Sequence, residues 1–136
     1  SLRLIAIFLA GIVVMRAEGC IANDLADTPV LLVNPRIPLA TGPVFKAWDG
    51  VDRGALEGEN LREMALSGRN DLEAPALTLV SEIGEVLAAL ERTGPWLTRM
   101  SGSGATCFAL YETIEDRDAA KAAMPAQWWT LAGALR

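Results

Sequence analysis

The sequence predicts an α+β fold, in which an antiparallel sheet is covered by helices on one face. Three observations support this prediction: an apolar run closed by a proline at residues 29–35, apolar side chains at helical spacing over residues 70–95, and two short apolar runs around a glycine-rich loop within residues 96–111. The order strand, helices, strand–loop–strand, helix, strand is typical of such α+β domains. At 136 residues, the chain is long enough for one domain with a buried core.

The first segment, LRLIAIFLAGIVVM, is an apolar run that begins after Arg3. It superficially resembles a signal peptide, but it is shorter than the about 20 residues that a membrane-spanning helix needs. The Val, Ile and Phe side chains around Gly11 favour two buried strands joined by a turn. A secreted protein with a cleaved leader is the alternative interpretation of this segment.

The next segment, PVLLVNP, predicts a buried strand that stops at Asn34-Pro35, because proline supplies no N–H to a ladder. Thr41 is then expected to cap a short helix with Pro43 in its first turn. This helix would contain three large apolar residues: Val44, Phe45 and Trp48. The glycine- and acid-rich residues 49–60 predict a solvated connection, and the sequence NLREMAL predicts a short helical piece.

Residues 70–95 predict one long helix. Its buried face would be formed by apolar side chains that recur at steps of three and four: Leu77, Val80, Ile83, Leu87 and Leu90. Pro75 suits the first turn of such a helix, and Gly94 followed by Pro95 is the expected stop.

The two strands around the glycine-rich loop are followed by the predicted helix IEDRDAAKAAM. This helix offers three alanines for close packing: Ala119, Ala122 and Ala123. The sequence WWTLAGALR predicts a final strand. We expect one of Trp128 and Trp129 to lie in the core and the other at the surface.

The composition excludes several kinds of function. The chain has no histidine, which rules out Ser–His–Asp and Cys–His sites within it and removes the commonest metal ligand. Cys20 and Cys107 match no zinc spacing and are expected to be reduced thiols in a cytoplasmic protein, with Cys107 as a small buried residue. The net charge of −5 and the scattered basic residues argue against a nucleic-acid partner. We therefore expect no metal site in this chain, and no nucleic-acid or membrane partner.

The loop in RMSGSGATCFAL poses the main functional question, since its small residues can bring main-chain N–H groups close to a phosphate or form a tight turn. A Walker loop would need a lysine after Gly104, and a dinucleotide fingerprint would need a glycine in place of Cys107. A nucleophile elbow needs glycines two residues before and after its serine, and Ser103 has Ser101 and Ala105 at those positions. Spacing alone therefore favours a plain glycine turn and leaves phosphate binding open.

The surrounding residues add a family resemblance. NDLEAPA before the long helix, RMSGSGATCFALYE, the alanine-rich helix and the tryptophan pair together resemble the C-terminal half of the 4-diphosphocytidyl-2-C-methylerythritol kinases. These enzymes are a family within the GHMP small-molecule kinase superfamily. VLLVNPRIPLATGPVFKAW and LRLIAIFLAG resemble two further segments of the same kinases, so the resemblance covers nearly all of the chain.

The resemblance implies transfer of the γ-phosphate of ATP, with Mg²⁺, to the 2-hydroxyl of the diphosphocytidyl methylerythritol, a step of non-mevalonate isoprenoid biosynthesis. It implies a ferredoxin-like C-terminal domain at residues 26–136, preceded at 1–25 by a strand pair from the end of an N-terminal domain. The loop would line the cleft for phosphate and substrate with Ser101, Gly102, Ser103, Gly104, Ala105 and Thr106. Thr41, Asn70 and Asp71 are candidates for a wall of the substrate cleft, with helix capping as their alternative role.

The resemblance also predicts features that are missing from this chain. The main ATP loop and the cytidine site would belong to an N-terminal half, and the family's catalytic aspartate would fall between Leu4 and Ile5, where this sequence has none. No catalytic residue is therefore assigned, and we expect the chain alone to be inactive. The alternative function is a non-catalytic α+β binding or interaction module that retains the kinase fold without its site.

Overall fold

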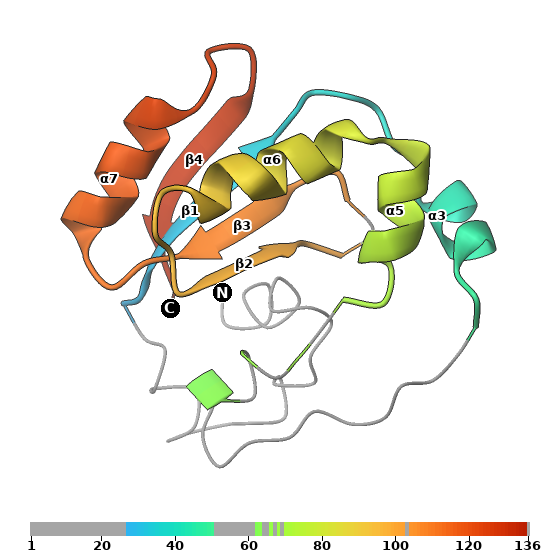
Figure 1. Ribbon diagram of the computed structural model, residues 1–136, viewed down its shortest axis with the longest axis horizontal. Coiled ribbons are helices and arrows are strands. Elements are labelled where there is room, and N and C mark those ends of the chain that lie inside the picture. Colours follow the sequence, from blue (N-terminus) through green and yellow to red (C-terminus); the bar gives the residue numbers. More distant parts are fainter. Residues whose placement is uncertain are drawn as a thin grey trace.

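The computed structural model describes residues 27–50, 70–102 and 104–135, together with residues 62, 63, 66 and 68. Strands and helices follow one another in the order that the sequence predicts, which confirms the α+β class (Figure 1). The elements are β1 (Pro29–Asn34), α3 (Thr41–Ala47), α5 (Glu73–Leu79), α6 (Glu82–Glu91), β2 (Leu97–Met100), β3 (Cys107–Leu110), α7 (Ile114–Ala123) and β4 (Trp129–Ala134).

The strands form a four-stranded antiparallel sheet with the order β2-β3-β1-β4. β1 lies between β3 and β4, so that Val33 is opposite both Cys107 of β3 and Thr130 of β4. β2 and β3 form a hairpin in which Met100 is opposite Cys107. The glycine-rich loop joins these two strands and lies at the end of the sheet that is nearest to α5 (Figure 1).

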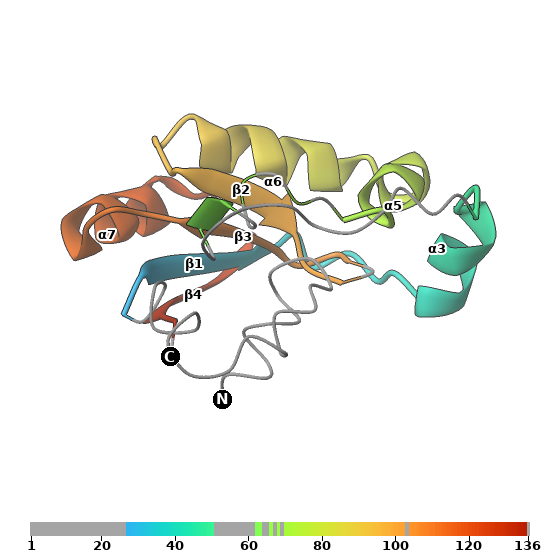
Figure 2. The same cartoon turned by 90° about the horizontal axis from the view of Figure 1, so that it is seen from below.

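Helices α6 and α7 cover one face of this sheet, as the sequence predicts (Figure 2). α6 packs on β2 and β3, whereas α7 packs on β1 and β4. The side chains of β1 alternate, and every second one is buried. The core between helices and sheet includes Leu31, Val33, Ile83, Val86 and Leu90, all inaccessible to solvent. No helix in the described part of the chain combines the length and hydropathy that crossing a membrane requires.

Several expectations lie outside the described residues. They concern the strand pair at residues 1–25, most of the connection at 49–60, and Ser103 within the glycine-rich loop. The predicted helical piece NLREMAL is described only at three positions, and each is helical: Arg62, Glu63 and Leu66. The strand pair and the domain boundary near residue 25 therefore remain predictions.

The prediction of one long helix over residues 70–95 is wrong, because the segment forms two helices, α5 and α6. The break lies at Val80, whose φ of −136° and ψ of 93° are extended. The N–H of Val80 still donates to the Ala76 carbonyl oxygen at 2.9 Å, and the Val80 oxygen accepts from the N–H of Ile83 at 3.2 Å. The break is thus a sharp bend at a buried valine.

Local chemistry explains this break. Thr78 and Val80 are β-branched and, together with Ser81, have lower helix propensity than the leucines, alanines and glutamates that make up most of α6. The Thr78 hydroxyl also donates to the Pro75 carbonyl oxygen at 2.7 Å, an arrangement that bends helices. After the bend, a Cβ on Gly84 would lie 3.4 Å from Leu77 Cδ2, so α5 and α6 approach closely there. Because the apolar steps of three and four continue through residue 80, periodicity alone could not reveal the bend.

The start of α3 corrects the expected cap at Thr41. The N-cap is Ala40, which makes no side-chain cap bond, and Thr41 is the first helical residue. Pro43 does lie in the first turn, as predicted. Proline is tolerated at any position of the first turn, because the N–H groups there have no partner within the helix. The position of Pro43 therefore does not determine which residue is the N-cap. Val44 is the buried residue of this helix, and Trp48 follows it as the C-cap.

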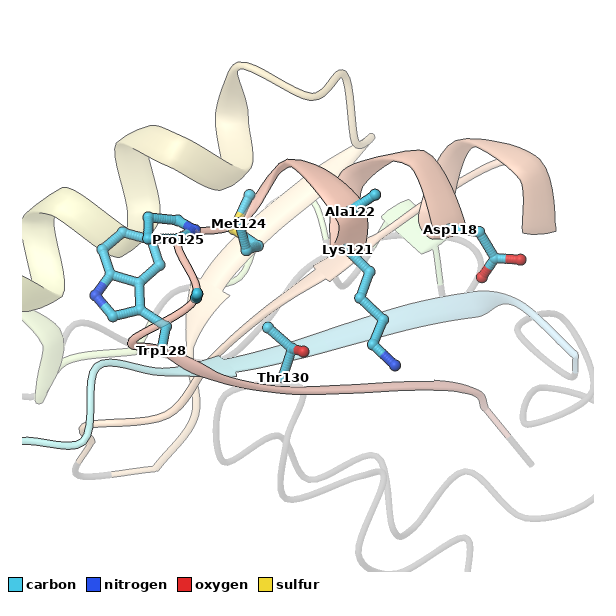
Figure 3. Close-up of a pocket in the computed structure, with 8 residues that line it drawn as sticks. Asp118, Lys121, Ala122, Met124, Pro125, Trp128 and Thr130 are labelled. Atoms are coloured by element: carbon cyan, nitrogen blue, oxygen red, sulfur yellow. The ribbon is translucent and has the colours of Figure 1, made fainter.

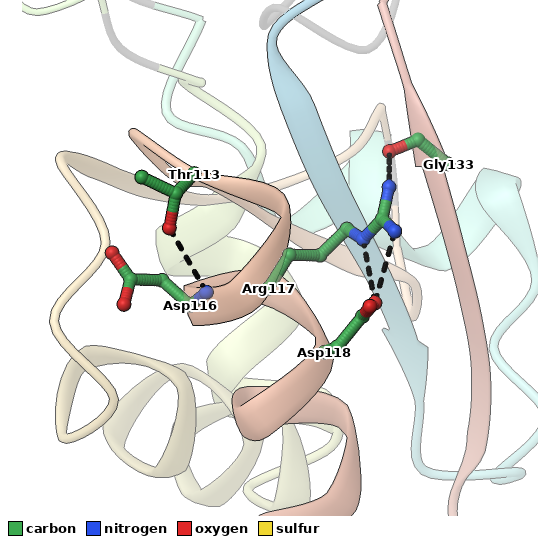
Figure 4. A network of polar contacts seen from close by, with 5 residues as sticks. All are labelled: Thr113, Asp116, Arg117, Asp118 and Gly133. Carbon is green, nitrogen blue, oxygen red and sulfur yellow. Dashed lines mark hydrogen bonds and ion pairs between the residues drawn. The ribbon is translucent and has the colours of Figure 1, made fainter.

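Helix α7 begins with a side-chain cap and is tied to the edge strand β4. The Thr113 hydroxyl oxygen accepts the N–H of Asp116 at 3.1 Å (Figure 4). Arg117 donates to the main-chain oxygen of Gly133 on β4 at 2.7 Å, and it also pairs with Asp118 at 2.9 Å. The bond from Arg117 to Gly133 therefore ties α7 to β4, whereas the other two interactions are local to the helix and its cap.

The close packing of α7 uses a different alanine from those expected. Ala120 is only 2% exposed, whereas the three predicted alanines are exposed: Ala119, Ala122 and Ala123. Alanines lie on several sides of this helix, so composition did not show which side would face the sheet. The expectation for the tryptophans is confirmed, since Trp128 packs against the core and Trp129 is 39% exposed.

Candidate functional site

The glycine-rich loop from Ser101 to Thr106 is a closed turn between β2 and β3. The N–H of Ser101 donates to the Thr106 carbonyl oxygen at 2.8 Å, and the N–H of Gly104 donates to the Ser101 carbonyl oxygen at 3.0 Å. The strand–turn–strand interpretation of this segment is therefore confirmed. A role in ligand binding would depend on the main-chain N–H groups that make no hydrogen bond within the turn.

Two glycines of the loop are required for different reasons. Gly104 has a φ of +93°, and a Cβ there would lie 3.0 Å from Met100 Sδ and 3.1 Å from Leu39 Cδ2. Gly102 has a φ of +55°, but a Cβ on it would have no heavy atom within 4 Å. Gly104 is thus fixed by conformation and packing together, whereas Gly102 is fixed by conformation alone and borders open space.

Asn70 holds the entrance of this loop. Its side-chain amide nitrogen donates to the Met100 carbonyl oxygen at 2.9 Å and to the Gly102 carbonyl oxygen at 2.6 Å. Its side-chain oxygen accepts the N–H of Leu72 at 3.0 Å, which shapes the turn before α5. Asn70 is therefore not the cap of α5, because the N-cap is Leu72, which makes no side-chain cap bond. The Asn70 oxygen shapes the turn two residues before that cap, and its nitrogen binds the loop.

Glu73 is the first residue of α5 and binds the strand that leads into the loop. Its carboxylate accepts the main-chain N–H of Met100 at 3.1 Å. Asp71, between Asn70 and Glu73, lies half-buried in the turn before the helix. The NDLE segment thus joins the start of α5 to the end of β2, which the sequence separates by about thirty residues.

Asn34 holds the exit of the loop, and sequence analysis did not identify it as a site residue. Its side-chain amide donates to the Thr106 hydroxyl oxygen at 2.9 Å, and its side-chain oxygen accepts the N–H of Arg36 at 2.7 Å. The only sequence signal was the Asn34-Pro35 pair, which predicted the end of a strand. Nothing in that pair indicates a contact 72 residues further along the chain.

Thr41 is the first residue of α3 and is exposed to solvent. Leu39, two residues earlier, is the residue of this segment that approaches the loop, at 3.1 Å from where a Gly104 Cβ would be. The structure therefore brings together Asn70, the segment before α3 and the described residues of the loop, and it places Thr41 on the helix that follows.

Two titratable groups near the loop are strongly affected by burial. Arg99, two residues before the loop, is only 7% exposed, and its Nη1 atom has no hydrogen-bond partner in the described structure. Burial lowers the pKa of Arg99, and the negative charge of Glu73 opposes that change. Burial, with a smaller effect of Glu73, raises the pKa of Cys107 to about 12. Cys107 is therefore a neutral, buried thiol, as predicted, and not a nucleophile at neutral pH.

Two hollows lie elsewhere on the described surface. One, of about 500 Å³, lies between α7 and β4, with Trp128 at one end and Asp118 at the other (Figure 3). The second, of about 540 Å³, lies between α6 and the end of α7, and the two share Met124, Pro125 and Trp128. Neither is lined by residues of the glycine loop, so neither forms part of the candidate site.

Comparison with known proteins shows the family. The profile of the family described as GHMP kinases C terminal matches residues 54–129. A 4-diphosphocytidyl-2-C-methyl-D-erythritol kinase from Novosphingobium aromaticivorans is 79% identical over 116 residues, which cover 85% of this chain and 41% of that protein. A kinase of the same name from Sphingopyxis alaskensis is 57% identical over 116 residues, which cover 82% of this chain and 41% of that protein. The chain thus spans less than half the length of these relatives.

A solved structure agrees with this assignment. The crystal structure of a 4-(cytidine 5'-diphospho)-2C-methyl-D-erythritol kinase matches with a TM-score of 0.70 and 30% sequence identity, over 80% of this chain and 43% of that chain. The matched family profile covers more than half of the sequence, and the α+β sheet with its helices on one face is the fold that this resemblance implied. The chain therefore belongs to the GHMP kinase family, of which it carries the C-terminal domain.

Proposed function

We propose that the full-length protein containing this chain is a cytoplasmic, ATP-dependent kinase of non-mevalonate isoprenoid biosynthesis. It phosphorylates the 2-hydroxyl group of 4-diphosphocytidyl-2-C-methylerythritol. The observation that carries this proposal is the 79% identity, over 85% of the chain, to a relative that bears this enzyme's name. The well-anchored glycine loop supports it, because phosphoryl transfer depends mainly on positioning and on stabilising negative charge.

The loop can contribute a main-chain donor to such a site. The Ser101 carbonyl oxygen points into the turn, where it accepts from Gly104. Because a peptide unit is planar and trans, the N–H of Gly102 on the same unit points the opposite way. That N–H has no main-chain partner among the described residues, and a Cβ built on Gly102 would have no heavy atom within 4 Å. An anionic oxygen could therefore approach the backbone at Gly102.

ATP would supply the transferred phosphoryl group when bound, and Mg²⁺ would neutralise its phosphate oxygens. Gly102 and Arg99 fit a role at the edge of a phosphate site, because Gly102 offers an N–H that no described main-chain oxygen accepts, and Arg99 offers a buried guanidinium whose Nη1 atom has no hydrogen-bond partner. The described residues contain no group of three or more carboxylate or thiol side chains that could hold a metal ion. We therefore assign Mg²⁺ no ligand among them.

The remaining assignments follow the same proposal. Residues 26–136 form the C-terminal domain, and residues 1–25 form a strand pair that ends the N-terminal domain. Thr41 and Asp71 contribute to the wall of the substrate cleft, and residues 101–106 form its phosphate-side edge. The isolated chain does not turn over substrate, because the family resemblance assigns the main ATP loop to an N-terminal half, and this sequence has no aspartate between Leu4 and Ile5, where the resemblance places the catalytic one.

A phosphotransfer assay tests the proposal directly. The purified full-length protein is mixed with ATP, Mg²⁺ and 4-diphosphocytidyl-2-C-methylerythritol, and ADP release is measured together with the ³¹P spectrum of the product. We expect one ADP for each new phosphomonoester, and no ADP with the 2-deoxy analogue of the substrate. Absence of transfer to the natural substrate would overturn the proposal, and turnover by the isolated 136-residue chain would overturn the claim that it is inactive.

A further inference from the structure

We propose that Asn70 is a positioning residue of the glycine loop, a role that rests on the proposed kinase function and goes beyond shaping the turn before α5. Its NH₂ group has two hydrogens, and the two carbonyl oxygens within reach, of Met100 and Gly102, take one each. These carbonyls lie at the entrance and near the tip of the turn. A single side chain from another part of the sequence thus fixes two peptide units of the loop.

The loop needs an external anchor of this kind. Its glycines give the backbone many alternative conformations, and ordering each residue costs free energy. When Asn70 holds the Met100 oxygen, the N–H of Ser101 on the same planar unit must point the other way, toward the Thr106 oxygen, where it is found at 2.8 Å. Holding the Gly102 oxygen fixes the peptide unit that carries it, so the Ser101–Gly102 unit lies between two units that Asn70 holds. Asn70 therefore favours the closed turn, which directs the N–H of Gly102 outward.

The amide oxygen and the amide nitrogen of Asn70 bind different groups, so its role in the turn before α5 and its role in the loop can be tested separately. Asn70→Asp keeps an oxygen that can accept the N–H of Leu72, so the turn before α5 is retained. The same change replaces the NH₂ donor by a second carboxylate oxygen, which repels the carbonyl oxygens of Met100 and Gly102. Asn70→Ala removes both interactions. If Asn70 only shaped the turn before α5, only the alanine variant would have a less protected loop and a lower activity.

Thr78→Ala serves as the matched control. Thr78 lies on α5, and its hydroxyl donates to the Pro75 carbonyl oxygen within the same helix. Its removal deletes one side-chain hydrogen bond of this helix without touching the loop. Any effect that Asn70→Asp and Thr78→Ala share would therefore arise from α5 and not from the loop.

The first readout does not require activity. Amide hydrogen exchange is measured in the full-length protein for peptides that cover residues 101–106, below the melting temperature of every variant. We expect exchange in this region to be at least about tenfold faster in Asn70→Asp, as loss of the anchoring bonds implies, and unchanged in Thr78→Ala. Equal protection of the loop in Asn70→Asp and the wild type would overturn the proposal.

The second readout is kinetic. In the phosphotransfer assay, Asn70→Asp is expected to lower kcat about tenfold or more while the KM values for both substrates stay within about threefold, because positioning acts on the transition state. An unchanged kcat in an active wild type would overturn the positioning role. An inactive wild type would overturn the kinase proposal, and the exchange experiment would still decide whether Asn70 anchors the loop. If Asn70→Asp does not fold, Asn70→Ser replaces it, since a serine hydroxyl can accept the N–H of Leu72 but cannot reach both carbonyls.

Discussion

The side-chain amide of Asn34 donates to the Thr106 hydroxyl oxygen at 2.9 Å and joins the end of β1 to the exit of the glycine loop. At the entrance, the amide of Asn70 holds the Met100 and Gly102 carbonyl oxygens. Two asparagines from distant parts of the sequence therefore clamp the loop between them. A glycine-rich turn that is held in this way keeps one conformation without large side chains of its own.

The bond between Asn34 and Thr106 can be measured by a double-mutant cycle with Asn34→Ala and Thr106→Val. We expect a coupling free energy of about 1 kcal/mol, the usual net value of a partly buried hydrogen bond. Asn34→Ala should cost more than Thr106→Val, because Asn34 also accepts the N–H of Arg36. Urea unfolding of the four proteins gives these values, and a coupling below about 0.3 kcal/mol would show that the bond contributes nothing.

The two loop glycines should respond differently to substitution. Gly104→Ala adds a Cβ within 3.1 Å of both Met100 Sδ and Leu39 Cδ2 in a left-handed conformation, and we expect a cost of about 2–4 kcal/mol. Gly102→Ala meets open space, so it should cost only the conformational penalty of about 1–2 kcal/mol. Denaturant unfolding compares the two directly, and equal costs would contradict the packing role of Gly104.

Cys107 should be unreactive in the folded protein. Burial raises the pKa of its thiol to about 12, so almost no thiolate exists at neutral pH. In a Cys20→Ser background, a disulfide reagent at pH 8 should modify Cys107 at the rate of unfolding and not faster. Rapid modification without unfolding would contradict the burial of this residue.

The same burial predicts a loss of stability at alkaline pH. The pKa of Cys107 rises from 9.0 in the unfolded chain to about 12 in the folded one. Burial raises the pKa of Tyr111 as well, and the hydrogen bond between Tyr111 and Thr93 opposes that change. Folding therefore favours the protonated forms, so this stability is complete below pH 9 and is lost as the pH rises toward 12. Each proton that the folded chain retains and the unfolded chain has lost changes the free energy of unfolding by about 1.4 kcal/mol per pH unit. Cys107→Ala should reduce the slope of the free energy of unfolding against pH in this range. An identical slope in the variant and the wild type would contradict the contribution of Cys107.

The cap of α7 gives a simple test of local structure. Thr113→Ala removes the hydroxyl that accepts the N–H of Asp116, and the expected loss in the free energy of unfolding is about 1 kcal/mol. Thr78→Ala, within α5, is the comparison, and it should change stability by less than about 0.5 kcal/mol because alanine has the better helix propensity. Equal effects of the two changes would show that Thr113 is not a significant cap.

Local patterns predicted the strands and the hairpin well. The apolar run that ends at Asn34-Pro35 forms β1, and the two runs around the glycine loop form β2 and β3. These elements are set by residues that are close in sequence, and proline and glycine mark their ends. Helical periodicity was less reliable, because it continued across the bend at Val80 and missed the division into α5 and α6.

The contacts that shape the candidate site could not be predicted in this way. Asn70 was expected to be a cap or part of a substrate wall, but its amide binds carbonyl oxygens 30 and 32 residues later. Asn34 was seen only as the end of a strand. The burial of Arg99 was not predicted, because the sequence around a basic residue in a short strand does not indicate whether its side chain is buried. Each of these roles depends on which strands are neighbours in the sheet, and residue spacing does not contain that information.

The central claim is that this domain supplies the glycine loop to a phosphate-transfer site, and kinetics of loop variants in the full-length protein test it most directly. The wild type, Gly104→Ala and Thr113→Ala are compared with ATP and 4-diphosphocytidyl-2-C-methylerythritol at a temperature where all three are folded. The account predicts transfer by the wild type, a kcat at least about tenfold lower in Gly104→Ala, and an unchanged kcat in Thr113→Ala. No transfer by the wild type, or equal kcat values for the wild type and Gly104→Ala, would contradict it.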